Sequence, residues 1–151
     1  MDLGEDDLPE PEESFVFREP ESTYGSNSSE RIRFVNALRT RTKVAAVAVI
    51  DFLEMDRPSL AMREVSRQLI RSATSTAANY RAACLARSGR EFYAKMSIVV
   101  EEADETVFWL EILYESRLKV DKESLIPLGR EWREISKIMS KARSSYRNKK
   151  A

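Results

Sequence analysis

The chain has 151 residues, of which 42% are hydrophobic and 33% charged, and its 25 basic and 25 acidic residues give a formal net charge of zero. This length favours one domain, and no run of 18 uncharged apolar residues is present, which excludes an obvious membrane-spanning helix. Histidine is absent and Cys84 is the one cysteine. A Ser/His/Asp triad and an internal disulfide are thereby excluded, and the lone cysteine fits a reducing cytoplasm. We therefore expect a cytoplasmic protein that does not contact a membrane.

Residues 1–29 are predicted to form a disordered acidic tail. They contain three prolines and end in a Ser/Asn cluster at Ser26–Ser29. Such a segment buries too little apolar surface to offset the entropy lost on ordering. It also lacks the basic and then apolar regions of a secretory signal. The exception is the apolar patch Phe15-Val16-Phe17, which could dock on the folded body or on a partner.

The net charge of zero conceals an asymmetry between this tail and the rest of the chain. Residues 1–30 carry ten acidic residues and one basic residue, a net charge of −9. The remaining 121 residues carry 24 basic and 15 acidic residues, a net charge of +9. An acidic tail on a basic body is common in proteins that bind polyanions. The alternative interpretation is that the tail only aids solubility.

The first helix is predicted over about residues 30–55, with Ser28 or Ser29 as its cap. Apolar residues recur there at three- and four-residue steps and make one buried stripe. Between Val44 and Leu53 apolar residues also fill other faces of the helix. A helix that is apolar nearly all round is usually buried on more than one side, which is a first indication of a homo-oligomer. Pro58 ends the helix, because the residue before a proline is disfavoured in helical conformation.

The second helix is predicted over residues 59–87, and the third over residues 90–116 after a turn at Ser88-Gly89. The second contains a run of small residues, 72–78, that would let a neighbouring helix approach closely. The third carries a second apolar seam beside its main stripe, at seven-residue steps: Tyr93, Val100, Val107 and Tyr114. Two seams on one helix indicate burial against more than one neighbour, so we interpret the second as an oligomer seam.

The fourth helix is predicted over residues 121–147, with Pro127 in its first turn, where a missing N–H costs little. Short linkers force neighbouring helices to run antiparallel. No strand pattern competes with this assignment. The predicted fold is therefore all-α, an antiparallel up-down-up-down four-helix bundle over residues 30–147.

No catalytic residue, metal site or cofactor is predicted, since histidine and a Gly-rich phosphate loop are both missing. The best remaining candidate is an acidic cluster on the third helix that includes Glu101, Glu102, Asp104 and Glu105. Glu101 and Glu105 share a face, so one hypothesis is a metal-dependent enzyme in which they hold magnesium. The alternative is that these carboxylates pair with arginines of neighbouring helices, with Arg71 as a natural partner. A carboxylate held by arginine has a lowered pKa and is a poor general acid.

Asn79 interrupts the small-residue run of the second helix. It could contact a ligand. The alternative is a buried amide that fixes helix register, with Glu102 or Glu105 as its partner, because one polar group in an apolar seam is a known device for specifying register.

Basic residues provide a less specific indication of function. Phosphate contacts need only positive charge in a suitable arrangement, and no aromatic platform for stacking bases is evident. We therefore expect any nucleic-acid binding to be directed at the backbone. The candidates are Arg31, Arg33, Arg39, Arg41, Lys43, Arg63, Arg67, Arg87, Arg90 and Lys95, with Arg130, Arg133, Lys137 and Lys141 on the fourth helix. The alternative is that they form the solvated faces of an ordinary bundle.

Two stretches resemble a known family. They are RQLIRSATSTAANYRAACLARSGREF (67–92) and KMSIVVEEADETVFWLEIL (95–113). A small-residue run ending in Asn, then Ala-Arg-Ser at a loop, then Glu-Ala-Asp-Glu-Thr on the next helix resembles the four-helix bundle proteins, also called 23S ribosomal RNA intervening-sequence proteins. The resemblance extends more weakly over about residues 31–147, and the acidic tail falls outside it.

The resemblance implies an up-down bundle that assembles as a homopentamer and has no established catalysis. It also implies kinship with the accessory protein of diversity-generating retroelements, which binds a reverse transcriptase and nucleic acid through a basic surface. Arg71, Asn79 and Glu105 match recurrent polar positions of the family, and we interpret them as structural.

Two functions follow as hypotheses beside the metal-dependent enzyme. The first is a non-enzymatic oligomeric scaffold that binds RNA, DNA or a nucleic-acid enzyme such as a reverse transcriptase through a basic surface. The second is a protein-interaction module without nucleic acid, in which the acidic tail and its Phe15-Val16-Phe17 patch bind the partner.

Overall fold

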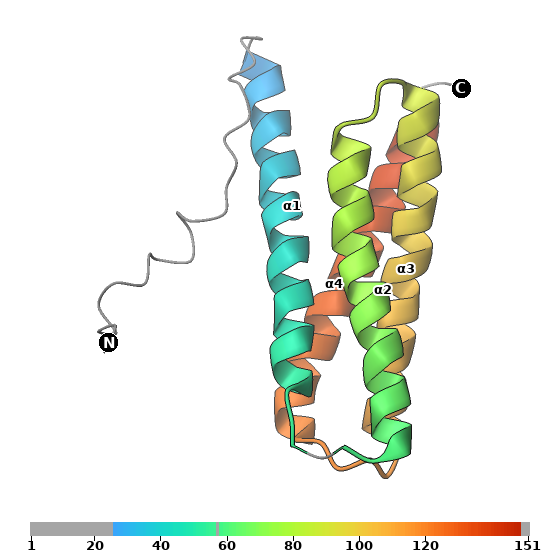
Figure 1. Cartoon of the computed structure of the whole chain (residues 1–151). Coiled ribbons are helices and arrows are strands. Elements are labelled where there is room, and N and C mark those ends of the chain that lie inside the picture. The colour runs from blue at the N-terminus through green and yellow to red at the C-terminus, as the bar shows by residue number, and fades with distance from the viewer. Residues whose placement is uncertain (1–25, 57, 149–151) are drawn as a thin grey trace, which may run out of the picture.

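The computed structural model describes residues 26–56 and 58–148, and these residues contain four α-helices and no strand. The helices are α1 (Ser26–Leu53), α2 (Leu60–Cys84), α3 (Gly89–Glu115) and α4 (Lys122–Asn148). Consecutive helices run in opposite directions and lie side by side (Figure 1). The predicted all-α four-helix bundle is confirmed.

The helix boundaries lie within four residues of the sequence-based expectations. α1 begins at Ser26, so the Ser/Asn cluster belongs to the helix and not to the tail, because no helix breaker follows Gly25 there. α2 ends at Cys84. The N–H groups of Leu85 and Ala86 donate hydrogen bonds to the carbonyls three residues earlier, and these bonds tighten the last turn. Residues 1–25, with the Phe15-Val16-Phe17 patch, lie outside the described residues.

Pro127 lies in the second turn of α4 and not in the first, since the helix already begins at Lys122. The two preceding helices begin at the serines that the sequence places before them. The Ser59 hydroxyl accepts a hydrogen bond from the Met62 N–H at 3.1 Å, and the Ser88 hydroxyl accepts one from the Glu91 N–H at 3.1 Å. These caps fix where the chain enters each helix after its loop.

The core extends along the whole bundle and is built from all four helices. Leu69, Met96, Leu113 and Trp132 are fully buried. The Trp132 indole N–H donates to the Ala45 carbonyl at 3.3 Å, which ties α4 to α1 and leaves no buried donor unsatisfied at this position.

α2 and α3 form the closest pair of helices, as the small-residue run predicts. Ser72 and Thr106 are both fully buried where the two helices meet. The Thr106 hydroxyl lies 2.9 Å from the Ser72 hydroxyl and 2.8 Å from the Glu102 carbonyl. These short polar side chains let the two backbones approach and fix their register.

α1 packs against α2 but contacts α4 only sparsely. Its outward face consequently leaves large apolar side chains exposed, with Phe34, Val44 and Val47 at 57%, 61% and 47% of full exposure. Within the described residues, no helix combines the length and the apolar character that a membrane span requires.

Candidate functional site

The bundle topology gathers basic segments from all four helices at one end. The start of α1, the end of α2, the start of α3 and the end of α4 meet there, at the top of Figure 1. We call residues 26–39, 79–99 and 139–148 the basic end, and they carry ten basic and two acidic residues, a net charge of +8. We call residues 40–78 and 100–138 the lower bundle, and they carry 12 basic and 14 acidic residues, a net charge of −2. Charge is therefore separated along the bundle axis.

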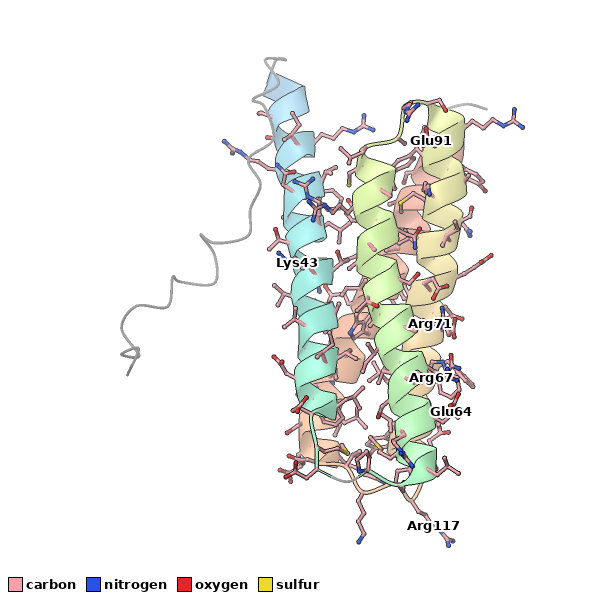
Figure 2. All side chains as sticks on the ribbon, in the orientation of Figure 1. Lys43, Glu64, Arg67, Arg71, Glu91 and Arg117 are labelled. Atoms are coloured by element: carbon pink, nitrogen blue, oxygen red, sulfur yellow. The ribbon has the colours of Figure 1, made fainter. Side chains whose placement is uncertain are left out.

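The predicted nucleic-acid candidates divide between these two regions. Arg31, Arg33, Arg39, Arg87, Arg90, Lys95 and Lys141 lie in the basic end, whereas Arg41, Lys43, Arg63, Arg67, Arg130, Arg133 and Lys137 lie in the lower bundle. In Figure 2, Arg67 of the lower bundle lies low on α2, and Glu91, a residue of the basic end, lies at the upper end of α3. The structure adds Arg81 and Arg143 to the basic end, two residues that could have been found by placing the predicted helices antiparallel.

Several arginines of the lower bundle are held by carboxylates of the same chain. The Arg41 guanidinium lies 2.6 Å from Glu131 and 3.1 Å from Glu134, and its hydrogen bond to Glu131 lowers the pKa of that carboxyl. Arg67 lies 2.9 Å from Glu64 on the same helix face. Arg133 of α4 lies 3.3 Å from Glu111 of α3. These contacts occupy Arg41 and Arg67, which we expected to be candidates for nucleic acid.

The basic end has too few acidic residues to balance its charge in the same way. Its two acids are Glu30 and Glu91, and the Glu91 carboxylate accepts a hydrogen bond from the Arg87 backbone N–H at 3.0 Å. The side chains of Arg31, Arg33, Arg81, Arg87, Arg90 and Lys141 are exposed. A surface of one sign concentrates counterions and attracts polyanions over distances of about 8–10 Å at moderate salt.

A groove opens at this same end, between α1, the α2–α3 loop and the last turns of α4. It encloses about 710 Å³, and its lining includes the aromatic side chains of Phe34, Tyr80, Phe92 and Tyr146. Arg31 and Arg87 also line it. We call it the end groove. The end groove therefore combines an apolar lining with positively charged arginines.

Gly89 shapes the floor of the end groove. A Cβ at this position would lie 1.3 Å from the Tyr146 hydroxyl oxygen, so only glycine lets Tyr146 lie across the start of α3. The Tyr146 ring then packs on Phe92, with ring centroids 5.3 Å apart. Burial raises the pKa of the Tyr80 phenol above its ordinary value.

The acidic cluster of α3 is engaged with Arg71, as one of the two sequence hypotheses predicts. The Arg71 guanidinium lies 3.2 Å from Glu102 and forms a second ion pair with Glu105. The hydrogen bond from Arg71 holds the pKa of Glu105 below its usual value, and the Trp109 indole N–H adds a hydrogen bond at 3.3 Å. Arg71 therefore pairs with carboxylates of this cluster, and the structural role of Arg71 and Glu105 stays a prediction.

These contacts argue against the magnesium hypothesis, because the Glu105 carboxylate is paired with Arg71. Among the residues that the structure describes, no three Asp, Glu, His or Cys side chains are grouped so that they could hold a metal ion. A carboxylate with a lowered pKa is also a poor general acid near neutral pH. The cluster is therefore best explained as a link between α2 and α3.

Asn79 does not make the expected contact with Glu102 or Glu105. Its amide nitrogen donates to the Ser75 carbonyl at 2.9 Å and to the Ser75 hydroxyl at 3.0 Å, both within α2. The buried hydrogen bond between α2 and α3 is made instead by Ser72 and Thr106. Shorter side chains reach across because the helices lie close together at this level.

The predicted oligomer seam is partly covered by the chain itself. Val100 and Val107 are half-buried against the core, and Tyr93 lies beside Tyr146 with ring centroids 6.4 Å apart. Tyr114 is 48% exposed, with the Lys122 ammonium 5.4 Å from its ring centre. The seam therefore leaves less apolar surface for a second copy than its sequence pattern indicates.

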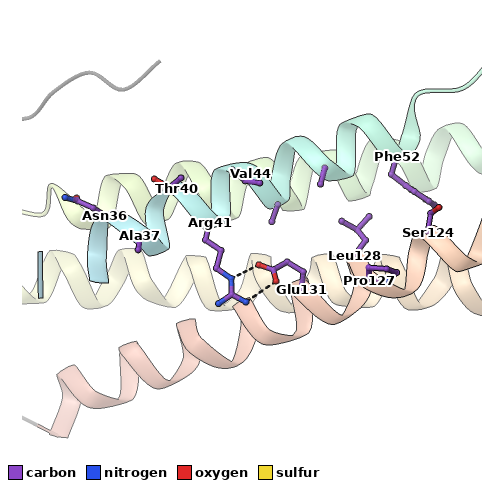
Figure 3. A pocket seen from close by; sticks show the side chains of 12 residues that line it. Asn36, Ala37, Thr40, Arg41, Val44, Phe52, Ser124, Pro127, Leu128 and Glu131 are labelled. Atoms are coloured by element: carbon purple, nitrogen blue, oxygen red, sulfur yellow. Dashed lines mark hydrogen bonds and ion pairs between the residues drawn. The ribbon is translucent and has the colours of Figure 1, made fainter. Parts of the chain in front are cut away.

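A second groove runs between α1 and α4, where those helices contact each other sparsely (Figure 3). It encloses about 840 Å³, and its lining includes the apolar side chains of Val44, Phe52, Pro127 and Leu128. The ion pair of Arg41 with Glu131 crosses it. These apolar side chains suit the packing of another apolar surface.

Comparison with known proteins places this fold and these residues in a family. The family model described as 23S rRNA-intervening sequence protein matches residues 38–141. A solved structure of a protein of unknown function from the S23 ribosomal protein family of Bacteroides thetaiotaomicron is similar, with a TM-score of 0.62 and 27% identity over 73% of this chain and 97% of that chain. Among curated proteins, none matches this chain. Because the family model covers more than half of the chain, the chain belongs to the 23S rRNA-intervening sequence protein family.

Proposed function

We propose that this protein is a non-enzymatic, self-associating scaffold whose basic end binds the backbone of a nucleic acid, either directly or as part of a complex with a nucleic-acid enzyme such as a reverse transcriptase. The observation that carries the proposal is the separation of charge, +8 in the basic end against −2 in the lower bundle. Neutralising phosphates with lysine and arginine releases counterions, and this release supplies most of the affinity of nonspecific complexes.

The chemistry of the basic end favours contacts with phosphates over contacts with bases. Tyr80 is buried, and Phe92 and Tyr146 are half-buried and pack on each other, so these rings are not arranged as an open stacking surface. The exposed groups are mainly guanidinium and ammonium groups, which bind phosphate oxygens without reading sequence. We therefore propose weak sequence preference and a strong dependence on salt.

Self-association is supported best by the outward face of α1. Val44, Val47 and Ile50 are exposed beside the α1–α4 groove, and burying each such side chain would stabilise an assembly by about 1.5–3 kcal/mol. Light scattering coupled to size exclusion would give the copy number, with a pentamer as one possible result. Val47→Glu should reduce the mass, whereas Leu60→Glu, at an apolar and exposed site at the start of α2, should not.

The direct test of nucleic-acid binding is fluorescence anisotropy with a labelled 20-nucleotide single-stranded RNA and a DNA duplex. We expect binding by the intact chain or by a chain that lacks residues 1–25, since all four helices begin after that point. The logarithm of affinity should fall with the logarithm of salt at a slope of about −3 or steeper for RNA, which corresponds to roughly four phosphates. Absence of binding by both chains at 50 mM salt would end the proposal.

The alternative function is a protein-interaction module that uses the acidic tail and no nucleic acid. It is supported by the apolar Phe15-Val16-Phe17 patch, which is unusual within such an acidic segment. A pull-down that recovers one protein partner only when residues 1–25 are present, together with no RNA binding, would favour this alternative.

A further inference from the structure

We infer that the end groove receives the Phe15-Val16-Phe17 patch of the same chain, so that the acidic residues around the patch cover part of the basic end. The docking itself depends only on the groove and the patch. Its consequence for nucleic acid rests on the proposed function of the basic end.

The end groove has the shape and chemistry of a site for apolar side chains. Its volume of about 710 Å³ lies within the usual range for binding pockets, about 300–1,000 Å³. Phe34 lines the groove and is 57% exposed. Leaving this apolar ring in water is unfavourable, so covering it would stabilise the protein. An aromatic side chain entering here would cover Phe34 and pack against Phe92 and Tyr146.

Chain connectivity places the patch within reach of this groove. Eight residues lie between Phe17 and Ser26, where α1 begins at the basic end, and this connection spans up to about 30 Å when extended. Phe34 lies about 12 Å along α1 from that point at 1.5 Å per residue. A segment tethered so closely has a high effective concentration at the groove, which a separate partner would have to exceed.

Charge complementarity also favours the acidic segment of residues 1–25 as the occupant of the end groove. Residues 1–25 carry nine acidic residues and one basic residue, a net charge of −8 that equals the +8 of the basic end in magnitude. Acidic residues stand on both sides of the patch, at Glu12, Glu13, Glu19 and Glu21. The groove lining carries Arg31 and Arg87. Phenylalanines in the groove would thus bring carboxylates to the arginines beside it.

Docking of the tail would therefore compete with nucleic acid for the same basic residues. A polyanion of high charge density displaces the tail, whereas an isolated phosphate does not. In this arrangement, a ligand binds the basic end only if its negative charge is high enough to displace the docked tail.

Cys84 allows docking to be measured in the full chain, because the chain's one cysteine lines the end groove and is partly exposed. In a Val16→Cys variant, docking brings two thiols together, and mild oxidation then joins them within one chain. A disulfide requires Cα atoms about 4.4–6.8 Å apart, so its formation reports contact. The matched control is Leu3→Cys, in the same acidic segment but away from the patch. Mass spectrometry of unreduced peptides identifies the linkage.

We expect the Val16→Cys chain to form the internal disulfide at least tenfold faster than the Leu3→Cys chain. Phe34→Ser, at an exposed position that the fold tolerates, should slow the reaction toward the control rate. Equal rates for the two cysteine positions would overturn the inference. Disulfides that join two chains would overturn it as well, since the tail would then dock on a second copy.

The second arm measures RNA affinity of the full chain by anisotropy. Phe15→Ser/Phe17→Ser keeps every charge and should bind single-stranded RNA about tenfold more tightly than the native chain, whereas Leu3→Ser/Leu8→Ser should match the native chain. Equal affinity of all three chains for RNA would overturn the covering of the basic end. If none of them binds RNA but the disulfide still forms rapidly, docking stands and the proposed function fails.

Discussion

The basic end and the lower bundle are built from the same four helices, yet they use their charged residues differently. In the lower bundle Arg41, Arg67, Arg71 and Arg133 each contact a glutamate of the same chain. In the basic end ten basic residues face two acidic ones, so pairing of this kind cannot balance them. Several arginines of the lower bundle are thus paired within the chain, whereas the basic end keeps an excess of positive charge that we propose a partner uses.

Neither set of charges holds the bundle together. Solvent-exposed ion pairs contribute about 0.2–1 kcal/mol each, whereas burial of one large apolar side chain contributes about 1.5–3 kcal/mol. The shared core therefore sets stability at both ends, and surface charge is left free to differ between them.

The largest expected effect comes from truncating a large side chain in the core that both regions share. Trp132→Ala should reduce the free energy of unfolding by about 3–5 kcal/mol, because the side chain is fully buried and its indole bonds to α1. Urea unfolding followed by circular dichroism measures this, with Leu60→Ala, at an exposed position, as a control that stays within about 0.5 kcal/mol. If hydrogen exchange showed the basic end still protected after the lower bundle had opened, the two regions would not share one cooperative core.

A smaller effect is expected where α2 and α3 meet within the lower bundle. Thr106→Val should cost about 1 kcal/mol, because it removes a buried hydrogen bond to Ser72 while keeping the shape of the side chain. Thr74→Val, on the exposed side of α2, serves as the matched control in the same unfolding measurement. Equal costs at both sites would show that the buried hydroxyl pair contributes nothing specific.

The Arg71 link distinguishes structural charge from binding charge. Arg71→Met should cost about 0.5–1 kcal/mol of unfolding free energy, since it leaves Glu102 and Glu105 without their cation while keeping much of the side-chain length. Arg63→Met, on the same helix, is the control. RNA affinity should change less than threefold in either variant. A large loss of affinity with Arg71→Met would place a binding residue in the lower bundle.

The smallest expected effect is a dependence of stability on pH that comes from the lower bundle. The pKa values of Glu105 and Glu131 are lowered below their ordinary value of 4.5 by hydrogen bonds from Arg71 and Arg41. Their contribution is therefore full above about pH 5 and is lost as pH falls below 4.5 through the folded-state values. Partial exposure limits it to less than about 0.5 kcal/mol per group.

Unfolding of the native chain and of an Arg71→Met/Arg41→Met variant between pH 6 and pH 3 would measure this contribution. The difference in stability between the two chains should narrow as the pH falls. A difference that stays constant across this range would mean that the two ion pairs do not stabilise the fold.

Much of the fold follows from local patterns in the sequence. The apolar periodicities locate four helices, Ser59 marks the start of the second, and Arg71 is a natural partner for the acidic cluster of the third. These features depend on residues a few positions apart or on one pair of neighbouring helices, which sequence patterns describe well.

The candidate site is harder to predict, because it depends on segments that are distant in the chain. Arg33, Arg81, Arg90 and Lys141 come together only once the direction of every helix is fixed. Asn79 illustrates the same difficulty, since its spacing is compatible with a contact across helices, but the nearby Ser75 offers a closer partner. Exposure of the predicted seam likewise depends on how far α4 covers α3.

The most direct test of the central claim compares two matched charge reversals in RNA binding. Arg33→Glu/Arg90→Glu/Lys141→Glu changes three exposed residues of the basic end, and Arg63→Glu/Arg117→Glu/Arg130→Glu changes three exposed residues of the lower bundle. Both lower the net charge equally, so general attraction falls to the same extent. We predict a loss of about 100-fold for the first and less than about fivefold for the second at low salt. Equal losses would contradict the claim that the basic end is the binding surface.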